Sequence, residues 1–316
     1  MFKTPRLMAT RFVSCFRSDK FMKMMNRNGI RYFHFSSSSL TTNLKSHVFI
    51  GDQKVPVFLA KGLESSIDID RVINYSPFKS WLTNIQNVMN ENQEKSLNSN
   101  TYHWKELLFE GIEIQSVDIF GSRNIIGFVK FKVNVTVKTD KDEIKKLPGI
   151  VFARGGSVGI LIVLQCIEDG KEYLLLVQQP RIAIGNLHSL EIPAGSMDDN
   201  GNFSGVAAKE VKEETGIEIK DAELIDLTEY CLESKFSGHY MSPGASDEVM
   251  RFFLHKTQMT RVQINALKEK MAGSEYENEI ILLKVLSIEE AVKTSPDAKL
   301  LVALFMYNLY LNKSKI

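Results

Sequence analysis

The run KEVKEETGI at residues 209–217 constrains the fold of this chain more than any other segment. On a helix, acidic residues at spacings i, i+3 and i+4 share one face, and this run has three of them: Glu210, Glu213 and Glu214. Like charges so placed repel one another by about 0.2–0.5 kcal/mol per exposed pair, unless a divalent cation neutralises them. The run therefore predicts a metal-binding helix face, with a solvated acidic face as the alternative.

Two glycines frame the acidic run. Gly195 lies upstream and Gly216 near its end, and because glycine tolerates positive φ, the pattern predicts a loop, a helix over 204–215 and a second loop. This unit resembles the Nudix box, whose pattern is Gx5Ex7REUxEExGU with U a bulky aliphatic residue. Seven residues occupy pattern positions at the correct intervals: Gly195, Glu210, Val211, Glu213, Glu214, Gly216 and Ile217.

Two positions depart from the box. Gly201 stands where the family has Glu, and Lys209 stands where it has Arg. In the family this pair braces the box and does not hold the metal, so the resemblance implies the loss of one ion pair and a retained metal site. Asp198 and Asp199 are close enough in sequence to offer Lys209 another partner.

Length and composition are those of a folded protein. The chain has 316 residues, of which 44% are hydrophobic and 24% charged, enough for one large core or two modest ones. Its cysteines are scattered, so neither a disulfide framework nor a CxxC metal site is expected: Cys15, Cys166 and Cys231. No run of 18 or more apolar residues occurs in the sequence, and we expect no membrane span.

The first 35 residues differ from the rest. They carry eight basic residues and one acid, Asp19, and Met8, Phe12 and Phe16 recur at i+4 as on one helical face. This segment resembles a mitochondrial presequence; the alternatives are a plastid transit peptide and a disordered basic tail on a cytosolic protein. Without it, 31 basic and 37 acidic residues remain, a net charge of −6. Such a balance argues against nucleic acid as a main partner.

Apolar patterns outline the remaining elements. Strands are expected at 55–59, 111–120, 126–137, 150 onward, 158–164, 173–177, 223–231 and 248–254. Helices are expected at 77–89, 263–271 and 287–311, and the polar run 90–100 indicates a linker or long surface loop. We therefore expect a presequence at 1–35, a smaller β-rich N-terminal dimerisation domain at 46–147, and a Nudix domain at 148–316 folded as an αβα sandwich with a mixed sheet.

Five further segments closely resemble the plant plastid ADP-sugar diphosphatase subgroup of Nudix hydrolases. They are DIFGSRNIIGFVKFKV (118–133), LPGIVFARG (147–155), LEIPAG (190–195), SPGASDE (242–248) and PDAK (296–299). The resemblance implies a homodimer that hydrolyses the diphosphate bond of an ADP-sugar, ADP-glucose or ADP-ribose, to AMP and a sugar phosphate. The alternatives are a Nudix hydrolase of another nucleotide, such as a dinucleoside polyphosphate or a nucleoside triphosphate, and a catalytically decayed nucleotide sensor.

The resemblance and the chemistry of a diphosphate assign roles to individual residues. Mg²⁺, with Mn²⁺ as a substitute, would be held by Glu210, Glu213, Glu214 and the backbone carbonyl of Ala194 or Gly195. The proton of the attacking water would pass to a free carboxylate, either Glu248 or a box glutamate, Glu213 or Glu214. Substrate contacts would come from Arg181, Gln179, Arg154 and Glu191. For Arg181 the alternative is a surface ion pair, and for Glu191 a buried structural carboxylate.

Overall fold

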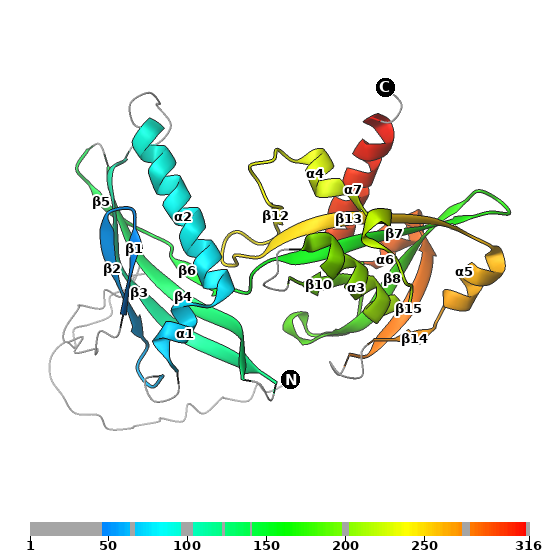
Figure 1. Cartoon of the computed structure of the whole chain (residues 1–316), viewed down its shortest axis with the longest axis horizontal. Helices are drawn as coiled ribbons and strands as arrows, with labels where there is room; N and C mark the ends of the chain where they lie inside the picture. Colours follow the sequence, from blue (N-terminus) through cyan, green and yellow to red (C-terminus); the bar gives the residue numbers. More distant parts are fainter. Residues whose placement is uncertain are drawn as a thin grey trace, which may run out of the picture. The chain divides into compact units, whose positions relative to one another are not determined.

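The computed structural model describes residues 46–63, 67–95, 104–121, 124–139, 141–197, 202–273 and 279–313 (Figure 1). The expected presequence 1–35 and the pair Asp198 and Asp199 lie outside these residues. The described chain forms two β-sheets that divide between Ala153 and Ser157, each with its own hydrophobic core. The domain boundary expected at 147/148 stays a prediction.

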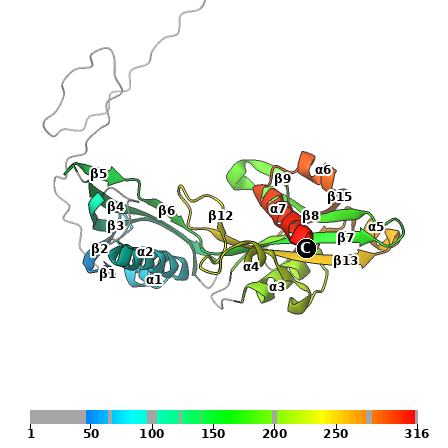
Figure 2. The ribbon, with the colours of Figure 1, turned by 90° about the horizontal axis from the view of Figure 1, so that it is seen from above.

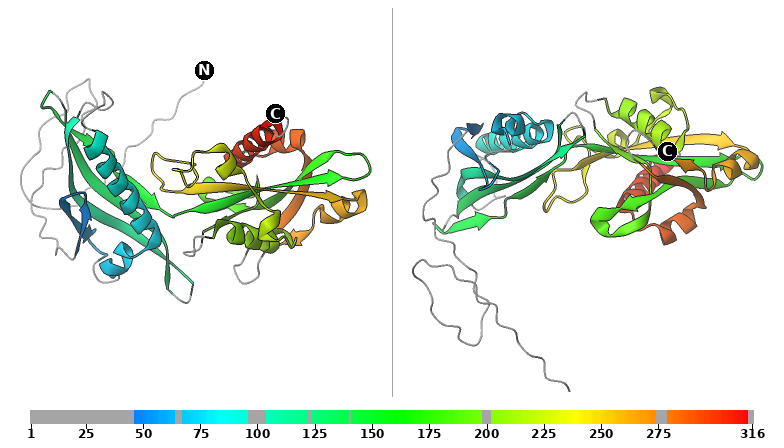
Figure 3. Two further views of the ribbon diagram at one scale, coloured as in Figure 1. Left: turned by 45° about the horizontal axis from the view of Figure 1, so that its top comes forward. Right: turned by 90° about the horizontal axis from the view of Figure 1, so that it is seen from below.

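The first sheet has six strands in the order β1-β2-β3-β4-β5, with β6 paired to β4. These strands are β1 (Ser46–Ile50), β2 (Gln53–Leu59), β3 (Trp104–Phe120), β4 (Ile125–Thr139), β5 (Ile144–Leu147) and β6 (Ile150–Ala153). Helices α1 (Ile69–Ile73) and α2 (Ser76–Lys95) follow β2, and α2 lies along one face of the sheet (Figure 3). Phe78 of α2 packs on Phe131 of β4 with ring centroids 5.1 Å apart, which anchors the helix to this sheet.

The second sheet has nine strands and a mixed topology. Its path is β11-β13-β7-β8-β15-β14, with β10 on β7, β12 on β13 and β9 on β8. The strands are β7 (Ser157–Cys166), β8 (Glu172–Arg181), β9 (Asn186–Glu191), β10 (Ala194–Ser196), β11 (Ile225–Asp226), β12 (His239–Tyr240), β13 (Val249–Met259), β14 (Met271–Ala272) and β15 (Ile281–Ser287). Only β13 and β7 run parallel; the other pairs are antiparallel. The strands expected at 158–164 and 173–177 are confirmed as β7 and β8, which form an antiparallel hairpin whose turn contains Gly170 at φ +69°.

Helices cover both faces of this second sheet. Helices α3 (Phe203–Thr215) and α5 (Arg261–Leu267) share one core with it, while α4 (Leu227–Cys231), α6 (Ile288–Thr294) and α7 (Ala298–Lys313) share the other. Strand β7 supplies alternate residues to the two cores, for example Ile160 to the first and Leu161 to the second, because successive strand residues point to opposite faces. Figure 2 shows α3 and α7 on opposite sides of the sheet. The αβα sandwich with a mixed sheet is therefore confirmed.

Helix α2 corrects one expectation. It continues through residues 90–95, which the sequence indicated as part of a linker. These residues are polar but contain no glycine or proline, and Glu, Gln and Lys favour helix, so a polar run can extend a helix. Residues 96–100 of the expected linker lie outside the described part.

Two C-terminal expectations are also corrected. Residues 227–231 form α4 and not a strand, because Asp226 caps the helix by accepting from the amide of Glu229 at 2.8 Å. The helix expected over 287–311 is two helices, α6 and α7, separated at 295–297, where Pro296 cannot donate an amide. No helix among the described residues is long and apolar enough to cross a membrane.

Candidate active site

Helix α3 carries the acidic run and is capped at both ends. The Asn202 side chain accepts from the amide of Gly205 at 3.1 Å, and Gly216 ends the helix at φ +72° with its amide donating to Lys212 O. Val206 and Val211 are buried in the core beneath. Packing of the apolar face of α3 fixes the rotation of the helix about its axis. The acidic face is thereby directed at the loop that contains Ala194 and Gly195. The expected helix over 204–215 is confirmed.

Glu214 and Glu210 meet at the loop that precedes α3. Glu214 is 2% exposed and accepts a hydrogen bond from the amide of Ala194 at 3.1 Å. Glu210 lies against Gly195 so closely that a Cβ there would be 1.9 Å from its carboxylate. Burial, followed by the charge of Glu210, raises the pKa of Glu214 well above its ordinary value. Two oxygen ligands thus converge where a cation would relieve both burial and repulsion.

Glu213 takes a different direction. Its side chain is 30% exposed, and its Oε2 lies 3.4 Å from the Nζ of Lys209. Among the residues that the structure describes, no three His, Cys, Asp or Glu side chains are grouped closely enough to hold one metal ion. The structure therefore brings together two of the three expected metal ligands, Glu210 and Glu214, and leaves Glu213 in an ion pair with Lys209.

The donor set fits a hard divalent cation. Carboxylate and carbonyl oxygens are the ligands that Mg²⁺ takes in proteins, and Glu210, Glu214 and the loop residue Gly195 supply these oxygens. Gly195 pairs with Val158 of β7, and the carbonyl of Pro193 accepts from the amide of Ile160 at 2.8 Å, so the loop is held by the sheet. A metal at this position would rest on rigid elements.

Arg181 and Glu191 form a bidentate ion pair beside the loop. Arg181 Nε and Nη2 donate to the two Glu191 oxygens at 2.9 and 3.0 Å. Lys299 Nζ lies 3.1 Å from Glu191 Oε2 and 2.9 Å from Asp297 Oδ1. Burial raises the pKa of Glu191, but the hydrogen bonds from Arg181 and the charges of Lys299 and Arg181 outweigh it and lower the pKa to about 2. Glu191 is therefore charged at neutral pH, and the Arg181 charge also reaches Glu214.

Gln179 is buried next to this ion pair, and its Nε2 has no hydrogen-bond partner among the residues that the structure describes. Gln179 belongs to β8 and pairs with Ser189 of β9, two residues from both Arg181 and Glu191 along their strands. A buried amide without an acceptor costs about 1–3 kcal/mol, so such groups are associated with a bound water, an ion or a functional role. Gln179 thus offers a donor for a ligand.

Arg154 and Glu248 lie together at the start of β7. Arg154 Nη2 is 3.5 Å from Glu248 Oε1, which also accepts from the Ser157 hydroxyl at 3.0 Å. The neighbouring Asp247 accepts from the amides of Arg154 and Gly155 at 2.8 and 3.2 Å. Because Ser157 pairs with Ser196 of β10, its hydrogen bond places Glu248 next to the strand that follows the loop at 192–193.

Three residues with no expected role belong to these networks. Lys299 and Asp297 contact Glu191 or its neighbours, and the charge of Glu279 raises the pKa of Glu214. Lys299 and Asp297 belong to the PDAK segment, which resembles the family but to which no functional role was assigned from the sequence. Glu279 carries no motif, and only folding brings β15 towards α3.

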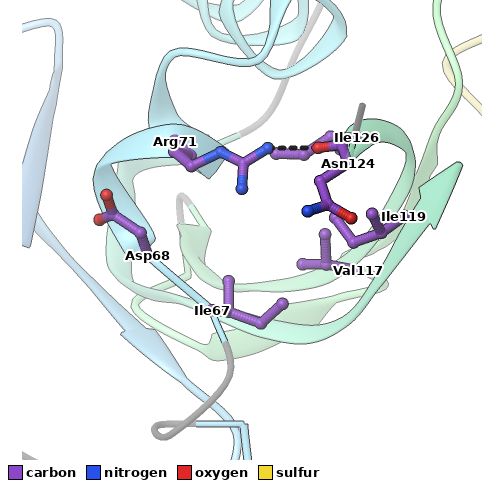
Figure 4. Close-up of a pocket in the computed structure, with 7 residues that line it drawn as sticks. All are labelled: Ile67, Asp68, Arg71, Val117, Ile119, Asn124 and Ile126. Atoms are coloured by element: carbon purple, nitrogen blue, oxygen red, sulfur yellow. Dashed lines mark hydrogen bonds between the residues drawn. The ribbon is translucent and has the colours of Figure 1, made fainter. Parts of the chain in front are cut away.

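The cavity in Figure 4 lies elsewhere, with a volume of about 340 Å³. It is lined by Ile67, Asp68, Arg71, Val117, Ile119, Asn124 and Ile126. Arg71 Nη2 donates to the Asn124 carbonyl at 2.6 Å, which closes one side of it. None of the expected site residues lines this cavity.

Comparisons with known proteins agree with the box. The NUDIX domain family matches residues 157–305. Nudix hydrolase 14, chloroplastic, of Arabidopsis thaliana is 36% identical over 87% of this chain and 82% of its own length. ADP-ribose pyrophosphatase of Bacillus subtilis (strain 168) is 28% identical over 49% of this chain and 67% of its own length. A crystal structure of an ADP compounds hydrolase aligns with a TM-score of 0.43 and 14% identity over 68% of this chain and 98% of its own. The chain belongs to the Nudix hydrolase family.

Proposed function

We propose that this protein hydrolyses the diphosphate bond of ADP-ribose or ADP-glucose with Mg²⁺, giving AMP and a sugar phosphate. The observation that carries the proposal is the buried Glu214 and the half-buried Glu210 against Gly195, a site where a cation would relieve burial and repulsion. The choice of an ADP-linked substrate is supported by the ADP-ribose pyrophosphatase of Bacillus subtilis and by the likeness of the flanking segments to ADP-sugar diphosphatases.

Glu210, Glu213 and Glu214, with the carbonyl of Ala194 or Gly195, would hold Mg²⁺ or Mn²⁺. When bound, the metal neutralises charge on the nonbridging phosphate oxygens and acidifies a water. Glu213 pairs with Lys209 through an exposed contact worth at most about 1 kcal/mol, so it is available as a ligand.

Glu248 is the proposed proton acceptor, with a box glutamate, Glu213 or Glu214, as the alternative. Water attacks phosphorus, the bond to the bridging oxygen breaks, and the water proton passes to the carboxylate. Ser157 and Arg154 hold Glu248 Oε1, so the second oxygen, Oε2, remains to accept the proton. Arg181, Gln179, Arg154 and Glu191 are the proposed substrate contacts; the guanidinium fork of Arg181 suits a diphosphate.

The proposal is tested by assaying ADP-ribose, ADP-glucose, UDP-glucose, NADH and diadenosine polyphosphates with Mg²⁺. We expect turnover of the ADP-sugars and a loss of about 10²-fold or more in Glu214→Gln. Glu218→Gln is the matched control, because Glu218 pairs with Lys212 at 2.7 Å on the exposed surface. Preferred turnover of a dinucleoside polyphosphate or another nucleotide would support the alternative of a Nudix hydrolase with a different substrate. Nucleotide binding without turnover would support a catalytically decayed nucleotide sensor.

We further propose that the protein is a homodimer. Several apolar side chains of the first sheet are exposed, among them Ile144 (75%) and Ile150 (53%) on β5 and β6. A second copy of this sheet would remove them from water at about 25 cal/mol per Å². Light scattering should give twice the monomer mass, and Ile144→Lys with Ile150→Lys should give the monomer mass. A wild-type monomer at assay concentration contradicts the proposal.

We propose organelle targeting by residues 1–35, with the mitochondrion as destination. The name of the Arabidopsis relative, chloroplastic, supports the plastid alternative. The location of a fluorescent fusion of these residues distinguishes the two organelles. A second fusion, in which the eight basic residues are Gln, tests whether targeting depends on their charge. A diffuse cytosolic signal from both fusions contradicts targeting.

A further inference from the structure

The segment 295–299, which leads into α7, contacts the last two residues of β9 and the residue that follows them. The Ser295 hydroxyl donates to the carbonyl of Leu190 at 2.5 Å, and Asp297 Oδ2 accepts from the amide of Ile192 at 3.2 Å. Between them, Lys299 Nζ donates to Glu191 at 3.1 Å. The polypeptide on both sides of Glu191 and its carboxylate are thus fixed by one helix end, on the face of the sheet opposite α3.

Lys299 is almost enclosed by this network. Its side chain is 18% exposed, and those of Glu191 and Asp297, which it bridges, are each 6% exposed. Two buried carboxylates need more than one cation, and a Lys ammonium with three donors can serve both. Without Lys299, Glu191 and Asp297 would share the single guanidinium of Arg181.

Glu191 in turn orients Arg181. Its carboxylate occupies the Nε and Nη2 edge of the guanidinium, and a bidentate contact fixes the plane of that group. The Arg181 side chain is 40% exposed, and within the described part of the chain its Nη1 makes no hydrogen bond. One edge of Arg181 is therefore held by the protein and the other is presented to a ligand.

We propose that Lys299 is a positioning residue, which fixes Glu191 and through it aims Arg181 at the diphosphate of the nucleotide. The inference deepens the proposed function and rests on it. Lys299 acts on substrate binding and not directly on metal binding, because its hydrogen bonds lead through Glu191 to Arg181 and not to the proposed metal ligands.

Lys299→Met tests this role, with Lys299→Arg as the conservative variant. In Lys299→Met we expect KM for ADP-ribose to rise about tenfold, kcat to change by less than about threefold, and the Mg²⁺ concentration for half-activation to stay constant. Lys299→Arg should restore most of the KM, since a guanidinium can also reach two carboxylates. Affinity for α,β-methylene ADP-ribose, measured by calorimetry, should fall by the same factor as KM rises.

Lys284→Met is the matched control. Lys284 of β15 is 26% exposed and pairs with the exposed Glu269 at 2.7 Å, so its loss removes a lysine ion pair away from Arg181. If Lys299→Met lowers Tm as Lys284→Met does but leaves KM and analogue affinity unchanged, Lys299 is only structural and the inference fails while the proposed function stands. If Lys299→Met does not fold, Lys299→Gln is judged by the same KM and affinity criteria. If the wild-type protein neither binds the analogue nor turns over an ADP-sugar, both proposals fail.

Discussion

Gly195→Ala should weaken metal activation while leaving the fold intact. The added Cβ would lie 1.9 Å from Cδ and Oε1 of Glu210, where ordinary contact begins at 3.4 Å, so the carboxylate must retreat by about 1.5 Å. Mg²⁺ binds oxygen at about 2.0–2.1 Å in near-ideal octahedral geometry, and a shift of that size takes Glu210 out of coordination. The Glu210 side-chain end is flexible, so the cost in folding free energy is small.

The assay is a Mg²⁺ titration of ADP-sugar hydrolysis, with Tm measured in EDTA. We expect the Mg²⁺ concentration for half-activation to rise about 10–100-fold in Gly195→Ala, with Tm in EDTA nearly unchanged. Gly170→Ala is the control: Gly170 has φ +69° and open space around its Cβ, so alanine costs about 1–2 kcal/mol in strain without touching Glu210. A wild-type Mg²⁺ response in Gly195→Ala would refute the assignment of Glu210 as a ligand.

Two further substitutions probe the charge networks. The folded pKa of Glu191 is about 2, below its ordinary 4.5, so its stabilisation is complete above about pH 5 and is lost as pH falls towards 2. In urea unfolding between pH 5 and 3, the wild type should lose about 2 kcal/mol more than Glu191→Gln; parallel losses contradict this. Arg251 Nε lies 2.6 Å from Asp226, and its guanidinium stacks on Phe203 of α3 at 5.0 Å. Arg251→Ala should cost about 2 kcal/mol by thermal unfolding, and an unchanged Tm would contradict it.

The sequence predicted correctly those elements in which the capping residues and the apolar periodicity indicate the same secondary structure. The helix over 204–215 has a capping Asn202, apolar residues on one face and a terminal glycine, so its limits were predicted within one residue. The α7 helix was harder to delimit, because α6 and α7 are both apolar and Pro296 was the only local sign of their separation. Residues 225–231 contain β-branched and apolar side chains typical of a strand, but the Asp226 cap favours a helix.

The site was predictable where one short segment contains it. Glu210 and Glu214 meet because one helix turn separates them, which spacing alone reveals. The pairing of Lys299 with Glu191 joins positions 108 residues apart, and no periodicity encodes such a contact. Arg154 was expected to contact substrate and Glu248 to accept a proton, and their mutual ion pair became visible only in the folded chain.

Residues 190 to 194 are each hydrogen-bonded to another part of the fold, and three elements share these contacts. Leu190, Glu191 and Ile192 are held by α7, the Pro193 carbonyl by β7, and the Ala194 amide by α3. The stretch that precedes Gly195, the proposed carbonyl ligand, therefore connects the two helical layers through the sheet. We expect a substitution in the first turn of α7 to alter substrate preference from the opposite face of the sheet, without any change in the acidic residues of α3.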